Sequence, residues 1–96
     1  MVYSVDLSKA YFNLSNDERI SVWHSSIYTA LLYLWSQNNF TNRIPITRKV
    51  LMRHCHISSI ATYHKCIKEL QEFGYIKYVP TYNSFFGSYI SILIAE

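Results

Sequence analysis

The residues Ile57–Ile76, ISSIATYHKCIKELQEFGYI, carry the strongest structural pattern in this chain. It predicts a capped helix that stops at a glycine and leads into a strand. Ser58 or Ser59 is placed to cap the helix, because a serine hydroxyl accepts a hydrogen bond from a first-turn amide that has no partner within the helix. Gly74 stands where a residue in the left-handed conformation would end it.

This helix is expected to have one apolar face and one polar face. Its apolar residues recur at the three- and four-residue spacing of a single helical face; they are Ile60, Tyr63, Cys66, Ile67, Leu70 and Phe73. The opposite face carries Thr62, His64, Lys65, Lys68 and Gln71. Such a face is also typical of an ordinary solvated surface helix, so the neighbouring segments decide between the two interpretations.

Upstream, the segment Asn42–Thr47, NRIPIT, contains a proline between two isoleucines and predicts an edge strand or an extended link. Thr47 is placed to cap a second, shorter helix over about Arg48–His54. This helix would bury Val50 and Leu51 and expose Arg48, Lys49 and Arg53. Only Cys55, His56 and Ile57 separate it from the serine cap, which favours a tight turn between two crossed helices.

Downstream, Tyr75–Val79 is rich in aromatic and β-branched residues and predicts a strand that ends at Pro80. The polar and aromatic turn TYNSFFGS follows. Residues Tyr89–Ile94 then alternate as a half-buried antiparallel strand does, with Ile90, Ile92 and Ile94 on one side. We expect the two strands and their turn to form a β-hairpin.

The segment Ser21–Gln37, SVWHSSIYTALLYLWSQ, predicts a helix with apolar residues around most of its circumference. A stripe that wide is typical of a helix buried on two sides, so this helix is expected to be the scaffold for the shorter pair. Its apolar residues are Val22, Ile27, Leu31, Leu34 and Trp35 on one side, with Trp23, Tyr28 and Leu32 nearby.

We expect residues 1–18 to form an N-terminal arm or helix, and residues 19–96 to form the one folded domain of the chain. The arm has Leu7, Ala10, Tyr11 and Leu14 at helical spacing, after Asp6 as a possible cap. It packs either on its own domain or on a second subunit, and the sequence leaves both open. The expected fold class is α+β, mainly helical, with a three-helix core and a sheet of two to three strands.

Charge is unevenly distributed along the chain. The formal net charge is only +3, yet residues 43–78 hold seven basic residues against two acidic ones. Basic groups gathered around a pair of helices are typical of phosphate binding, because each neutralised phosphate releases condensed counterions. A solvated charged face is the alternative.

The order helix, short strand, helix, turn, helix and hairpin resembles the winged helix-turn-helix proteins, among them MarR-like regulators and the N-terminal domains of plasmid replication initiators. More narrowly, the strings LYLWSQNNF, ATYHKCIKEL and GYIKYVPTYNSFFGS resemble small winged-helix proteins of bacterial mobile elements and plasmids. The resemblance covers roughly Ser21 to Ile94. It implies double-stranded DNA as partner, with the helix over 59–73 inserted in the major groove.

The resemblance carries groove-facing positions onto Ser59, Ala61, Thr62 and Lys65. Tyr63 falls where such regulators have a smaller buried aliphatic, so it is either a core residue or turns its hydroxyl towards a phosphate. The hairpin tip, often basic in these proteins, is Asn83, Ser84, Phe85 and Phe86 here.

The function expected from these patterns is DNA binding, with regulation of transcription, replication or mobile-element transfer by occupancy. Lys65, Thr62 and His64 would contact base edges or nearby phosphates, and the cations of the second helix and Lys68 would fix register on the backbone. The whole expected DNA-binding set is Arg48, Lys49, Arg53, Ser59, Ala61, Thr62, His64, Lys65, Lys68 and Lys77.

The rival hypothesis is a winged-helix module that docks a protein partner through aromatic residues of the hairpin. Those residues are Tyr82, Phe85, Phe86, Tyr89 and Leu93. RNA binding is a weaker third hypothesis, because no aromatic sheet platform is apparent. A homodimer is also expected, and its interface is the arm, the first helix or the last strand.

Other classes of function have little support. The six carboxylates are scattered and neither glycine lies in a phosphate-cradling loop, so we expect no enzyme, no small-molecule substrate and no cofactor. The spacing of Cys55 and Cys66 with His54, His56 and His64 matches no standard zinc site, so no metal is expected. A signal peptide and a membrane-spanning apolar run are not evident, which favours a cytoplasmic protein without a membrane partner.

Overall fold

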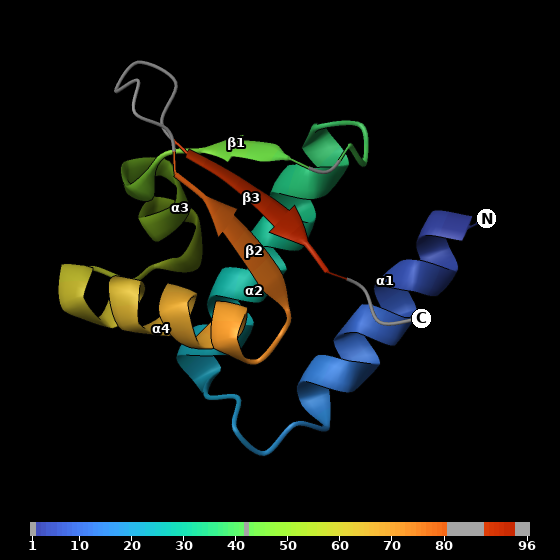
Figure 1. Cartoon of the computed structure of the whole chain (residues 1–96), viewed down its shortest axis with the longest axis horizontal. Coiled ribbons are helices and arrows are strands. Elements are labelled where there is room, and N and C mark those ends of the chain that lie inside the picture. Colours follow the sequence, from blue (N-terminus) through green and yellow to red (C-terminus); the bar gives the residue numbers. More distant parts are fainter. Residues whose placement is uncertain (1, 42, 81–87, 94–96) are drawn as a thin grey trace.

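In the computed structural model, the described residues form four helices and a three-stranded antiparallel sheet (Figure 1). The structure describes residues 2–41, 43–80 and 88–93, with side chains from residue 8 onward. The elements are α1 (Val2–Ser15), α2 (Val22–Gln37), β1 (Ile44–Ile46), α3 (Arg48–Cys55), α4 (Ile60–Glu72), β2 (Ile76–Val79) and β3 (Ser88–Ile92). The expected α+β class is confirmed, and the strands lie within about two residues of the expected bounds.

The strands lie in the order β1-β3-β2, so the last strand of the chain is central. Ile90 of β3 pairs with Ile44 of β1, and Ile92 pairs with Ile76 of β2. β1 is an edge strand, as the proline predicted, because Pro45 lacks the N–H that an inner strand would donate. The expected turn over 81–87 lies outside the described residues.

The core lies where α2 and α4 meet the sheet. Ile27 and Leu31 of α2, Leu70 of α4, and Ile76 and Ile90 of the sheet are all fully buried. α2 contacts α1, α3 and α4, which confirms the scaffold role expected of this helix.

The first turn of α2 corrects the expected stripe. Val22 is 72% exposed and Trp23 is also exposed, although both were expected to be apolar packing residues. The buried part of α2 begins only at His24, because the helix starts at its Ser21 cap before it reaches the other helices. Helical periodicity predicts which side a residue is on, but not whether a neighbour covers it.

The N-terminal arm is a helix that packs on its own domain. Ala10 and Leu14, four residues apart on one face of α1, are buried in the common core. Two expectations were wrong. Tyr11 is 61% exposed because it lies about 100° around the helix from Ala10, and Asp6 falls inside α1 rather than at its start.

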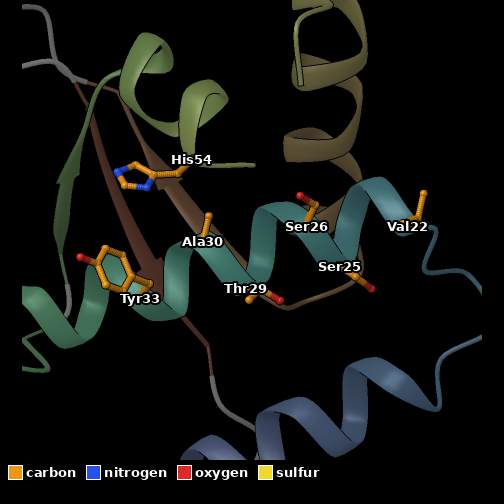
Figure 2. A pocket seen from close by; sticks show the side chains of 7 residues that line it. All are labelled: Val22, Ser25, Ser26, Thr29, Ala30, Tyr33 and His54. Carbon is orange, nitrogen blue, oxygen red and sulfur yellow. The ribbon is translucent and has the colours of Figure 1, made fainter. Parts of the chain in front are cut away.

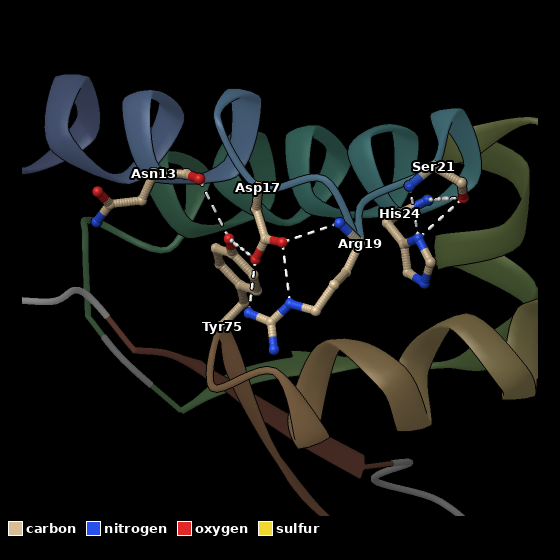
Figure 3. Close-up of polar contacts among 6 residues, drawn as sticks. All are labelled: Asn13, Asp17, Arg19, Ser21, His24 and Tyr75. Atoms are coloured by element: carbon tan, nitrogen blue, oxygen red, sulfur yellow. Dashed lines mark hydrogen bonds and ion pairs between the residues drawn. The ribbon is translucent and has the colours of Figure 1, made fainter.

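Hydrogen bonds among Asn13, Asp17, Arg19 and Tyr75, together called the polar latch, connect the end of α1 to the turn between α4 and β2 (Figure 3). The hydroxyl of Tyr75 donates to Oδ2 of Asp17 (2.7 Å) and to the carbonyl oxygen of Asn13 (3.2 Å). Nε and Nη2 of Arg19 donate to the two oxygens of the same carboxylate, at 2.9 and 2.7 Å. The guanidinium of Arg19 also lies 4.3 Å from the ring centroid of Phe73.

Because the polar latch contains the Asp17 carboxylate, the free energy of unfolding depends on pH in the acid range. Hydrogen bonds from Arg19 and then Tyr75 hold the pKa of Asp17 well below its usual range. A carboxylate with a lowered folded-state pKa contributes stability above its ordinary pKa, near 4, and that stability is lost as pH falls below it. When the pH is lowered from 5 to 2, the free energy of unfolding measured with urea should therefore fall less for Asp17→Asn than for the wild type.

The matched control for this experiment is Glu18→Gln, which changes the neighbouring exposed carboxylate and should keep the wild-type pH dependence. An Asp17→Asn curve that falls as steeply with acid as the wild-type curve contradicts the assignment of the latch.

Candidate nucleic-acid interface

α4 is fixed at both ends by the residues that the sequence singled out. The Ser59 hydroxyl oxygen accepts from the Thr62 amide (3.2 Å), so Ser59 rather than Ser58 is the cap. At the other end Gly74 has φ +87°, a conformation that favours glycine. The amide of Tyr75 then donates to the carbonyl of Leu70 (2.9 Å), which satisfies an end carbonyl of the helix.

The inner face of α4 is buried from Tyr63 to Leu70, with Cys66 and Ile67 between them, and Phe73 is half-buried. Ile60 is the exception, since 47% of it is exposed. It was expected in the apolar stripe, but it is the first residue of the helix and reaches past the edge of the core. Roughly half of the transfer free energy of isoleucine, on the order of 1 kcal/mol, is left unrealised at this position.

Tyr63 is a core residue, as one of its two expected roles required, although it also lines the hollow beside α4. Only 4% of it is exposed, and burial raises the pKa of its phenol to about 12. Its ring lies edge-on to His64, with 5.4 Å between centroids. The Tyr63 side chain therefore packs the inner face of α4 against the core.

α3 is held against α2 by its own caps and turn. The Thr47 hydroxyl oxygen accepts from the Val50 amide (3.2 Å), as expected. His56 ends the helix in the left-handed conformation, and the buried Ile57 fills the angle between α3 and α4. The Ser26 hydroxyl donates to the carbonyl of Cys55 (2.7 Å) and joins this turn to α2.

His24 joins α2 to α4. The amide of Ser21 donates to Nδ1 of His24 (2.9 Å, Figure 3), which places the proton of the neutral imidazole on Nε2. Nε2 then donates to Oε1 of Glu69, at 3.1 Å. With Cys66, these side chains bring possible metal-ligand atoms within 4.8 Å of one another. A metal ion would need the lone pair of Nε2, so this geometry favours a hydrogen-bonded bridge between the helices.

The cysteines and histidines considered in the sequence do not converge. Cys55 and Cys66 are free thiols inside the core, where burial raises the pKa of each. His54, His56 and His64 are exposed. The group containing His24 escaped sequence reasoning because its histidine is 45 residues away from Glu69.

Most side chains expected to contact DNA are exposed on α3 and α4. The exposed ones are Arg48, Lys49, Arg53, Ser59, Ala61, His64, Lys65, Lys68 and, on β2, Lys77. Thr62 is half-buried. Exposure alone does not bring these side chains together, and the hollows beside the helices show which of them are neighbours.

A hollow of about 540 Å³ lies on one side of α4, between the start of α3 and the sheet. Arg48, His64 and Lys68 line it, whereas Lys49, Arg53 and Lys77 do not. Sequence reasoning missed its uncharged wall, formed by side chains from distant elements. That wall includes Ile46, Thr47, Tyr63, Ile67, Gln71, Tyr78 and Ser88.

Hydrogen bonds organise this wall. The side-chain oxygen of Gln71 accepts from the amide of Tyr78 (2.7 Å), and the hydroxyls of Tyr78 and Ser88 are 2.8 Å apart. The hollow thus combines two permanent cations with hydroxyl groups, which suits an anionic chain such as a sugar-phosphate backbone.

A second concave surface, here called the outer groove, follows the solvent side of α2. One part, of about 680 Å³, lies between α2 and His54 of α3 (Figure 2), and another, of about 800 Å³, lies against α1. Thr29 and Tyr33 line both parts. Among the described residues lining the outer groove there is no lysine, arginine, aspartate or glutamate.

Comparisons of this chain with protein-family models, with curated proteins and with solved structures gave no match. In the part of the chain that the structure describes, none of the helices combines the length and the apolar character needed to cross a membrane.

Proposed function

We propose that this protein is a winged-helix DNA-binding protein that inserts α4 in the major groove. The observation that carries the proposal is the division of α4 into a buried face and an exposed face. Tyr63 and Leu70 fix the inner face, while Ala61, Lys65 and Lys68 are exposed. An α-helix with such a face fits the width of the major groove.

The sheet and α3 support the same proposal. The helix order and the strand order β1-β3-β2 are compatible with a winged helix. Arg48 and Lys68 line the hollow beside α4, which supports the proposal that a phosphate backbone runs alongside this helix. Lys49 and Arg53 extend the basic surface along α3, so these side chains fix register while α4 contacts the bases.

Occupancy of DNA is the proposed mode of action. The protein would regulate transcription, replication or mobile-element transfer by covering its site, without catalysis and without a cofactor. We propose a cytoplasmic location for it, because a protein that acts by occupying DNA must share a compartment with that DNA.

The charged face can be tested with fluorescence anisotropy on duplex DNA. Phosphate contacts make affinity fall with salt, and each lysine contact contributes about one unit to the logarithmic salt slope. The double variant Lys65→Glu, Lys68→Glu should therefore bind much more weakly than the wild type, with a slope smaller by about two.

Lys9→Glu is the control, because it reverses an exposed charge on α1 and should leave the affinity close to that of the wild type. Binding that does not respond to salt, or that survives the double variant, overturns the DNA-binding proposal.

The described residues give little support to the hypothesis that the hairpin binds a protein partner. The tip residues Tyr82, Phe85 and Phe86 lie outside them, and Tyr89 is half-buried, with the Arg43 guanidinium 4.8 Å from its ring centroid. Among the described members of that set, Leu93 is the one with an exposed side chain (44%). The outer groove offers a larger apolar surface for a partner.

A second copy of this chain is the partner that we propose for the outer groove. Two copies can meet there without bringing like charges together, which a two-fold interface between identical surfaces requires. The same surface carries exposed rings, Phe12 and Tyr33, and a floor of small side chains, Ser25, Ser26 and Ala30. A two-fold rotation can therefore place the rings of one copy over the floor of the other.

Exposed aromatic side chains of the outer groove supply part of the area that a dimer interface needs. At roughly 200 Å² for an aromatic side chain, the exposed parts of Tyr11 (61%), Phe12 (64%) and Tyr33 (52%) come to about 350 Å² on each copy. A standard interface buries about 800 Å² per partner, so three rings supply nearly half of that area.

Sedimentation equilibrium tests this pairing. The wild type should sediment as a dimer at micromolar concentration, and Phe12→Lys should sediment as a monomer, because it places two ammonium groups in an apolar interface. Gln37→Lys adds the same charge at an exposed position outside the groove lining and should remain dimeric. A monomeric wild type, or a dimer unaffected by Phe12→Lys, overturns the pairing.

A further inference from the structure

The tip of α4 exposes two aliphatic side chains next to the cations of the same helix. Ile60 is 47% exposed and Ala61 is also exposed, although Ile60 has the residue type and spacing of a core position. The Ser59 cap keeps both in the first helical turn. An isoleucine that the core does not cover is available for contact with a ligand.

We infer that Ile60, with Ala61 beside it, contacts the C5-methyl group of a pyrimidine in the major groove. This inference rests on the proposed DNA-binding function and names the chemical group read at the tip of α4. Among the base edges of the major groove, thymine presents a methyl group, and aliphatic side chains recognise it by apolar contact. The first residues of a recognition helix are the ones that contact base edges.

The spacing of residues along α4 gives the distance between the methyl contact and the contacts made by His64 and Lys65. His64 follows Ile60 by four residues, and Lys65 follows Ala61 by four, so each pair lies on one line of the helix. One helical turn rises about 5.4 Å, whereas successive base pairs are about 3.4 Å apart. The methyl group would therefore lie one or two base pairs from the groups that His64 and Lys65 contact.

The experiment starts from a duplex selected from a random pool by the wild-type protein. Two copies are synthesised, one with deoxyuridine in place of thymidine and one with 5-methylcytosine in place of cytosine. If the methyl group belongs to thymine, the deoxyuridine copy should bind the wild type about fourfold more weakly per contact, the effect of burying one methyl group. If it belongs to 5-methylcytosine, the methylated copy should bind more tightly by a similar factor.

Ile60→Ser should abolish the response to methylation while leaving the salt dependence of binding in place. Leu93→Ser is the matched control: Leu93 is also an exposed aliphatic residue (44%), and it lines neither the hollow beside α4 nor the outer groove. This variant should respond to the methyl group as the wild type does.

The outcomes separate this inference from the proposed function. A protein that binds the selected duplex and its two modified copies with equal affinity overturns the methyl contact and leaves DNA binding intact. A methyl response that persists in Ile60→Ser also overturns it. Failure to bind or select any duplex overturns both.

Discussion

The packing of α4 against α2 and the sheet is the interaction on which the rest of the structure depends. Leu70 and Ile67 are buried at this contact, and Tyr63 anchors the same face nearer the start of the helix. Because these side chains fix the rotation of α4 about its axis, the exposure of Lys65 on the other side follows from it. The bridge from His24 to Glu69 holds the same two helices together with a polar contact.

Much of this arrangement could be predicted from the sequence, because the signals are local. The Ser59 cap and the Gly74 stop each depend on residues within a few positions of one another. Pro45 marked an edge strand for a similar reason, since a missing amide donor is a property of one residue. The exposed cations of α3 followed from the Thr47 cap and helical periodicity.

Contacts between distant segments could not be predicted. The Tyr75 hydroxyl reaches Asp17 across 58 residues, and the hollow beside α4 takes walls from α3, α4 and the sheet. Periodicity also failed at helix starts, where it assigned Ile60 and Val22 to the core. An apolar residue in a first turn is buried only if another element reaches that turn, and a single sequence does not contain that information. The exposure of the first turn of α4, which makes it a candidate contact surface, is therefore known only from the structure.

The most direct test of the central claim is an NMR titration of the amide signals with a short DNA duplex. If the exposed face of α4 is the binding surface, shift changes should concentrate at residues 59–68 and at the start of α3, while amides along α1 stay constant. Changes concentrated along α1 and the solvent side of α2, with α4 unperturbed, would contradict the account.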